Sequence, residues 1–189
     1  MNLKQYRFIA YIGVFALIWI YFISIESCQM TNGKITTKIS EIEVERTQNA
    51  WAQGIIGIGG AYTNNRDYKD LAQRHVDQFY GFDLGKVIYK PAQSSSQKFR
   101  TTAEGTVADL VGENANFPED KGFALAPWKN ISWKNAGIIN GNGDIAIAMG
   151  SCTLTDTNGN ESVMDYTFAY RKNDEGQLKI VAQKSFISE

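Results

Sequence analysis

Four β-rich runs separated by three strong turn signals make the last third of the chain the part that constrains the fold most. The turn signals are "INGNGD", "DTNGNE" and "KNDEGQ". Asn, Asp and Gly between β-rich runs are typical of hairpins, because these residues accept the backbone angles of tight turns. The pattern therefore predicts an antiparallel meander with strands at residues 131–139, 145–155, 162–171 and 178–186.

Helical patterns precede this meander. Ser40 and Glu43 have the spacing of a capping box, and apolar residues at helical intervals predict helices over residues 40–62 and 67–80. Two short strands, a short helix and a long loop are expected next, at residues 86–92, 98–102, 102–110 and 111–128. This order predicts an α+β fold over residues 40–189, with helices packed on one face of a strongly curved antiparallel sheet that forms a cone.

Four glycines, at positions 54, 57, 59 and 60, lie in the first expected helix. Each lowers helix propensity by about 1 kcal/mol relative to Ala. A phosphate-binding loop is not indicated, since no expected strand precedes the glycines and their spacing is not G-x-G-x-x-G. They instead predict positions where another element packs closely against the helix.

The N-terminus carries an unbroken apolar run over residues 8–25, with positive charges before it. The run is near the lower length limit of a membrane-spanning helix, and the positive flank predicts export of the residues C-terminal to the run. Ser27 followed by Cys28 resembles a bacterial lipoprotein cleavage box, which makes Cys28 a candidate for lipidation. We expect residues 1–28 to be an uncleaved anchor, a lipoprotein signal or a secretion signal, and residues 29–39 to be a tether. Each alternative places the domain in the periplasm or at the cell surface.

Charge and composition exclude two classes of partner. The net charge of −1 and the lack of a basic run longer than two residues argue against nucleic-acid binding. Zinc sites need several His or Cys ligands, whereas the chain has 1 His and 2 Cys, one of which is at the expected anchor. We therefore expect no bound metal and no cofactor.

The last expected strand, in "LKIVAQKSFISE", carries two polar side chains on one side. Strict alternation places Gln183 and Ser185 on the side of Val181, and Ile180 and Lys184 on the other side. Because buried polar groups need partners, a Gln and a Ser on a protected face favour the wall of a polar pocket. A curved sheet crossed by helices leaves room for such a pocket.

Three further residues are candidates for binding. Tyr166 begins an aromatic stripe with Phe168 and Tyr170, which either packs the core or lines the pocket. His75 lies on the apolar side of its helix, where it either holds a hydrogen bond at the edge of the core or transfers protons in the pocket. Thr102, at the start of the short helix, is the third candidate.

The order of several motifs resembles the iota-class carbonic anhydrases. The motifs are "YTNNRDYKDLAQRHVDQFYGFDLGKVIYKP", "QKFRTT", "PEDKGFALAPW", "AIAMGSC" and "DYTFAYRKNDEGQLKIV". That family belongs to the nuclear-transport-factor-two-like cones and is similar to the association domain of calcium/calmodulin-dependent kinase II. The resemblance covers about residues 47–186 and implies reversible, metal-free hydration of carbon dioxide.

The resemblance also implies site residues, most of which are replaced in this chain. The family pattern has a Thr after the "KP" pair, a Tyr on the short helix before "VG", and His-His-Ser on the last strand. Here Ala92 follows "KP", Asp109 and Leu110 precede "VG", and the last run is Gln-Lys-Ser, ending at Ser185. Gln183 cannot accept a proton near neutral pH, so Asp109 is the candidate replacement acceptor.

Three functions are consistent with these residues. The first is a carbonic-anhydrase-like enzyme that acts on carbon dioxide and bicarbonate, with Ser185, Gln183 and Asp109 as catalytic residues and Asp109 or His75 as the altered base. The second is a non-catalytic module of the same fold that binds a small ligand or serves oligomerisation. Another hydratase or isomerase of the same fold, with His75 or Asp109 as its acid or base, is a less favoured alternative. The resemblance also implies a homodimer formed through the outer face of the sheet, and the N-terminus implies attachment to a membrane.

Overall fold

A computed structural model describes residues 30–31, 34–35, 38–93, 97–141 and 143–187 of the chain. The apolar run over residues 8–25 and the lipidation candidate Cys28 lie outside the described residues. None of the helices in the described ranges is long and apolar enough to cross a membrane. The chain divides into two units after Thr37. In the first unit, β1 (Met30–Thr31) and β2 (Lys34–Ile35) form an antiparallel pair.

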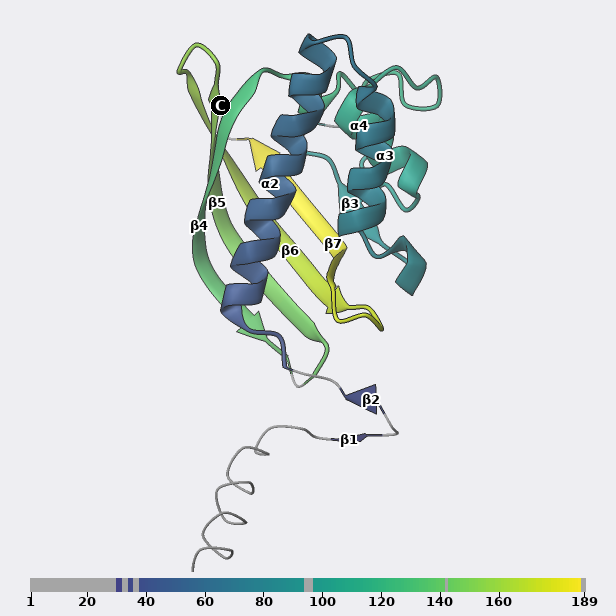
Figure 1. Cartoon of the computed structure of the whole chain (residues 1–189), viewed down its shortest axis with the longest axis vertical. Helices are drawn as coiled ribbons and strands as arrows, with labels where there is room; N and C mark the ends of the chain where they lie inside the picture. The colour runs from purple at the N-terminus through teal and green to yellow at the C-terminus, as the bar shows by residue number, and fades with distance from the viewer. Residues whose placement is uncertain (1–29, 32–33, 36–37, 94–96, 142, 188–189) are drawn as a thin grey trace, which may run out of the picture. The chain divides into compact units, whose positions relative to one another are not determined.

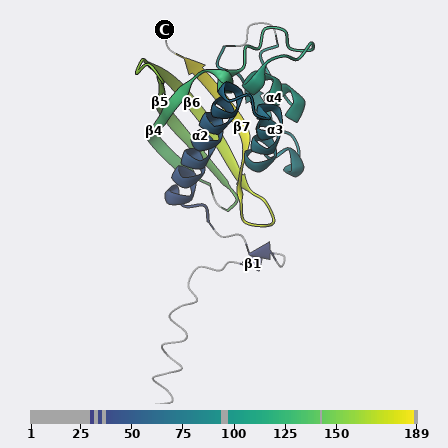
Figure 2. The same ribbon diagram turned by 45° about the horizontal axis from the view of Figure 1, so that its top comes forward.

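The second unit has a five-stranded sheet with its helices on one face. Figures 1 and 2 show α2 crossing the curved long strands, with α3 and α4 beside it. The strand order is β3-β7-β6-β5-β4. The elements are α2 (Glu41–Thr63), α3 (Tyr68–Phe79), η1 (Phe82–Leu84), β3 (Ile88–Lys90), α4 (Ala103–Val111), η2 (Phe123–Leu125), β4 (Trp128–Asn140), β5 (Ile145–Asp156), β6 (Glu161–Lys172) and β7 (Leu178–Ile187). The α+β prediction and the four-stranded meander are confirmed.

The prediction of a wholly antiparallel sheet is wrong at one edge. β3 pairs with β7 in parallel, with Tyr89 opposite Gln183. A parallel pair needs a long connection, which α4, the loop after it and the rest of the meander provide. The short strand expected at residues 98–102 is also absent, because Arg100 makes only an isolated bridge with Tyr89. This bridge brings the segment before α4 to the edge of the sheet.

The helix starts follow the sequence closely. Ser40 caps α2 in a capping box with Glu43, as predicted, and Asp67 and Thr102 cap α3 and α4. Helical spacing of the apolar residues predicts that Ile42 lies on the buried face of α2, but Ile42 is 66% exposed and Val44 is buried instead. Residues two positions apart are separated by about 200° around a helix axis, so these two side chains cannot both face the sheet.

Two of the four glycines of α2 lie where another element packs closely, as predicted. A Cβ at Gly54 would be 2.2 Å from Nδ1 of His75, and one at Gly59 would be 2.7 Å from the carbonyl oxygen of Ala124. At Gly57 and Gly60 no atom lies within 4 Å of such a Cβ. The first two glycines therefore allow α3 and η2 to approach α2.

A β-bulge interrupts the alternation of β7. Ala169 pairs with Ala182, but its neighbour Tyr170 pairs with Ile180, which leaves Val181 as the extra residue. Ile180 is consequently buried on the same side as Gln183 and Ser185, contrary to the strict alternation expected from the sequence. Beyond the bulge the alternation holds as expected, since Lys184 is exposed.

Candidate functional site

A cavity of about 680 Å³ lies between the helical layer and the inner face of the sheet. Side chains from α2, β3, α4, β6 and β7 line it, together with the segment from Glu119 to Trp128. Its polar wall includes Tyr89, Asp109, Asp120, Gln183 and Ser185. The structure thus brings the three predicted catalytic residues, Ser185, Gln183 and Asp109, to one cavity.

Gln183 and Ser185 are buried and hydrogen-bonded to each other. The Gln183 Nε2 donates to Ser185 Oγ at 3.2 Å, and Tyr80 donates its hydroxyl hydrogen to Gln183 Oε1 at 2.8 Å. The Tyr80 oxygen in turn accepts from Trp51 Nε1 at 3.2 Å. The polar side chains of β7 therefore have the partners that their burial requires.

Asp109 is a carboxylate of the cavity whose pKa is raised toward neutral pH. Tyr89 donates a hydrogen bond to its Oδ2. Burial raises the pKa of Asp109 to about 6 and the charge of Asp120 adds to this rise, while Tyr89 and Arg100 oppose it. Asp109 is thus ionised at neutral pH but more basic than an ordinary aspartate.

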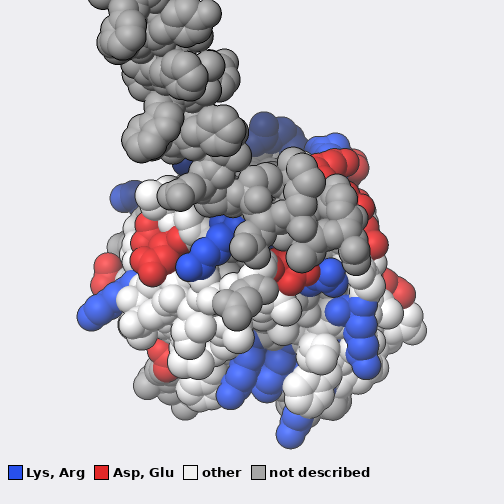
Figure 3. Space-filling view, turned by 90° about the horizontal axis from the view of Figure 1, so that it is seen from below, with Lys and Arg blue, Asp and Glu red and all other residues white. Residues whose placement is uncertain are grey.

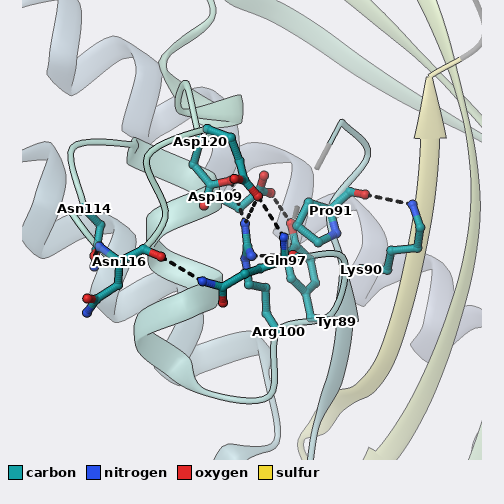
Figure 4. Close-up of polar contacts among 10 residues, drawn as sticks. Tyr89, Lys90, Pro91, Gln97, Arg100, Asp109, Asn114, Asn116 and Asp120 are labelled. Carbon is teal, nitrogen blue, oxygen red and sulfur yellow. Dashed lines mark hydrogen bonds and ion pairs between the residues drawn. The ribbon is translucent and has the colours of Figure 1, made fainter. Parts of the chain in front are cut away.

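Arg100 joins the edge of the sheet to the segment after α4 through a buried ion pair (Figure 4). Its Nη2 lies 2.8 Å from Asp120 Oδ1 and 3.7 Å from Glu119 Oε1. Its Nη1 donates to the carbonyl oxygen of Gln97, and the guanidinium lies 4.3 Å from the ring centre of Phe117. This cluster fixes Asp120 beside Asp109 at the wall of the cavity.

The structure places His75 away from the lining of the cavity. Its ring packs against Trp51 and Phe79, with ring centres 5.7 and 4.7 Å apart. Neither ring nitrogen has a hydrogen-bond partner among the described residues, so the hydrogen bond expected at the edge of the core is absent. Burial lowers the pKa of His75 to about 3, which keeps the ring neutral.

Tyr166 and Thr102 also lie outside the cavity lining. Tyr166 packs in the core, where its hydroxyl accepts from Gln48 Nε2 at 3.2 Å and donates to Asn135 Oδ1. Burial raises the pKa of Tyr166 to about 12. Thr102 is exposed and caps α4 by accepting a hydrogen bond from the Gly105 backbone at 3.1 Å.

Trp51, Tyr80, Tyr89, Arg100 and Asp120 complete the polar part of the site, and no sequence pattern had marked them as site residues. The demand of a buried Gln for partners indicated that some such groups exist. Which groups meet that demand depends on how α2, the end of α3 and β3 converge, which no local pattern specifies. Among the described residues, no group of three or more His, Cys, Asp or Glu side chains could hold a metal ion.

Comparison with known proteins agrees with this geometry. The metal-independent carbonic anhydrase family matches residues 42–187. A metal-independent carbonic anhydrase from Nostoc sp. (strain PCC 7120 / SAG 25.82 / UTEX 2576) is 37% identical over 154 residues, which cover 80% of this chain and 75% of that protein.

Among the solved structures, an iota-carbonic anhydrase is similar to this chain over most of its length. The crystal structure of a cyanobacterial iota-carbonic anhydrase complexed with bicarbonate matches with a TM-score of 0.78 and 35% identity, covering 85% of this chain and 99% of the other. A protein from Shewanella oneidensis MR-1 that is like nuclear transport factor 2, and whose function is unknown, is 15% identical with a TM-score of 0.43, covering 71% and 93% of the two chains. From the matched family and its close relatives it follows that this chain belongs to the metal-independent, or iota-class, carbonic anhydrases.

Proposed function

We propose that this protein catalyses the reversible hydration of carbon dioxide to bicarbonate without a metal ion. The observation that carries the proposal is the convergence of Ser185, Gln183 and Asp109 on one cavity, in a chain of this family. Bicarbonate bound to the cyanobacterial relative supports the ligand class. The family resemblance implies that several of its site residues are replaced here, so the proton acceptor is proposed for this chain specifically.

In this mechanism, a water molecule in the cavity attacks the carbon atom of carbon dioxide. A carbon–oxygen bond forms, one carbonyl π bond opens onto its oxygen, and the water proton passes to the Asp109 carboxylate and then to solvent. Ser185 donates a hydrogen bond to the oxygen that becomes negative. A carboxylate with a pKa of about 6 is well matched to accept and release protons near neutral pH.

Carbon dioxide hydration by the full chain, measured by stopped flow with a chelator present, tests the proposal. We expect activity that resists the chelator and falls at least about tenfold in Ser185→Ala and in Asp109→Asn. Lys184→Ala is the matched control, because Lys184 is on the same strand but exposed. A folded wild-type protein without activity would contradict the proposal.

The alternative is a non-catalytic module that binds a small ligand. The presence of Gln183 in place of a basic imidazole favours it, since an amide cannot take up a proton at neutral pH. This alternative predicts that bicarbonate binds to the cavity, with an affinity reduced by Ser185→Ala, while carbon dioxide hydration does not exceed the uncatalysed rate. The same two measurements therefore separate the two functions.

We further propose that a second copy of the chain covers the outer face of the sheet. An apolar row crosses all five strands on this face, and its neighbours in register are Ile139, Ile147, Ala169, Ala182 and Ile88. Ile139 is 70% exposed and Ile88 46% exposed, so a partner would remove considerable apolar surface from water. A homodimer buries the same row on both copies.

We also propose that the protein is exported and attached to a membrane through its N-terminus. The support is the apolar run over residues 8–25 with positive charges before it, and Cys28 after Ser27. Fractionation of cells that express the full chain, with and without Cys28→Ala, tests this proposal. Loss of acylation with retained membrane attachment would indicate an uncleaved anchor, and recovery in the cytoplasm would contradict export.

A further inference from the structure

We propose that Trp51 and Tyr80 are positioning residues that hold Ser185 as a hydrogen-bond donor toward an oxygen atom of the anion in the cavity. The proposal rests on the proposed function only for the identity of that anion, bicarbonate. It concerns the direction of a hydrogen-bond chain that runs from α2 through the end of α3 to β7. Each member of this chain is at most 5% exposed.

Trp51 sets the direction of the hydrogen-bond chain. An indole N–H can only donate, and Trp51 Nε1 lies 3.2 Å from the Tyr80 oxygen. The Tyr80 oxygen must therefore accept this hydrogen bond. Its own hydrogen is then directed to the remaining neighbour, Gln183 Oε1, at 2.8 Å. The burial of Tyr80 keeps this arrangement intact, because water cannot substitute for either partner.

Tyr80 in turn fixes the orientation of the Gln183 amide. With Oε1 accepting from Tyr80, Nε2 points to Ser185 Oγ at 3.2 Å. Flipping the amide would place an N–H group against the Tyr80 hydroxyl and leave the Tyr80 hydrogen without an acceptor. A buried donor without a partner costs about 1–3 kcal/mol, so the unflipped amide is favoured.

Ser185 is the last member of the chain and the one at the cavity. Its oxygen accepts from Gln183, and no described residue accepts a hydrogen bond from Ser185. The hydroxyl hydrogen is consequently available to a ligand, and the natural acceptor for it is an anionic oxygen. The neighbour that Ser185 contacts through its oxygen is the Gln183 amide, which cannot remove this hydrogen as a base would. Ser185 therefore acts as a hydrogen-bond donor and not as a nucleophile.

The hydrogen-bond chain keeps its direction over the working pH range. Burial raises the pKa of Tyr80 above its ordinary value, and the charge of Asp109 adds to the rise. Trp51, Gln183 and Ser185 do not titrate in this range. The donor at Ser185 is therefore present throughout this pH range.

A double-mutant cycle on bicarbonate binding tests the proposal, with affinities measured by carbon-13 NMR on the full chain. We expect Tyr80→Phe to weaken binding about tenfold in the wild-type background, as for the loss of one hydrogen bond to a charged group. In the Ser185→Ala background Tyr80→Phe should have no further effect, because its effect passes through Ser185. Tyr170→Phe, the same change at a buried tyrosine outside the chain, is the control and should leave the affinity unchanged.

A merely structural role of Tyr80 would weaken binding equally in both backgrounds, and this result would overturn the proposal.

The side-chain amide signal of Gln183, observed by nitrogen-15 NMR, gives a second readout that needs no ligand. We expect this signal to shift in Tyr80→Phe and in Ser185→Ala, but not in Tyr170→Phe. An unchanged signal in the first two variants would overturn the proposal. If wild-type protein binds no bicarbonate, the proposed function fails while the amide signal still decides the direction of the chain.

Discussion

At the scale of the residue, the chemistry of the site depends on the environment of Asp109. The carboxyl group faces Tyr89 from β3, Arg100 from the segment before α4, and Asp120 from the loop after α4. Burial and one like charge raise its pKa, whereas a hydrogen bond and one opposite charge lower it. An ordinary surface aspartate would be too weak a base for this reaction, and the cavity makes Asp109 a stronger one.

We predict that hydration activity falls as the pH is lowered through about 6, because the Asp109 base is then protonated. The pKa of this group is higher in the folded than in the unfolded chain, where it is about 3.8. As the pH falls, the folded state therefore binds this proton before the unfolded state does. Protonation of Asp109 between about pH 6 and 4 thus raises the free energy of unfolding. Stopped-flow rates and circular dichroism, recorded across this range, should show lost activity with the secondary structure intact. In Asp109→Asn the remaining rate should lack this acid limb, and an unchanged limb would assign it to another group.

At the scale of the element, close packing between α2 and α3 depends on Gly54. We predict that Gly54→Ala destabilises the fold by about 1–3 kcal/mol, because the new Cβ would collide with the His75 ring. This is the net change, after the gain of about 1 kcal/mol in helix propensity that alanine brings. Gly57→Ala, in the same helix but with free space around it, should instead be neutral or stabilising. Urea denaturation of both variants measures the difference, and equal stabilities would contradict this account.

The buried ion pair between Arg100 and Asp120 holds the segment after α4. A second prediction concerns how much this pair contributes to the free energy of unfolding. Arg100→Met should destabilise the fold by about 3–5 kcal/mol, because it leaves Asp120 buried without its partner. Arg74→Met is the matched control: Arg74 pairs with Asp70, both side chains are at least half exposed, and the loss should be at most about 1 kcal/mol. The two free energies of unfolding can be compared by guanidinium denaturation. Similar losses would mean that Arg100 is not the main anchor of this segment.

At the scale of the whole molecule, the helices of the domain lie on one face of the sheet (Figure 1). None of the described helices covers the apolar row on the other face. The face seen in Figure 3 carries both acidic and basic side chains, as expected for a chain of net charge −1. The outer sheet face is different, because its central row is apolar across every strand. Self-association is the simplest way to remove such a row from water.

We predict that Ile147→Lys, in the middle of this row, shifts the protein from dimer to monomer. Burying two additional ammonium groups at a two-fold interface costs more than the lost apolar contact alone. Ile42→Lys is the control, since Ile42 is an exposed Ile on α2, in the helical layer. Analytical ultracentrifugation of the full chain in detergent gives the masses. A wild-type monomer at micromolar concentration would contradict the proposed pairing.

The sequence by itself determined the elements whose signals are local. Capping residues such as Ser40, the Asn-Asp-Gly turns and the alternation of the long strands gave the order of helices and strands, because each depends on neighbours within a few positions. The polarity of Gln183 and Ser185 also predicted a pocket, since buried polar groups need partners.

Only the tertiary structure decided the parallel edge strand, the bulge at Val181 and the partners of the polar residues. These features depend on contacts between segments far apart in the chain, and their geometry is set by how the layers pack. The pairing of β3 with β7, the bridge from Arg100 to Tyr89 and the chain from Trp51 to Ser185 are all of this kind. His75 illustrates the same limit: its helical face could be read from the sequence, but packing against Gly54 and Trp51 determined that its nitrogens remain without partners among the described residues.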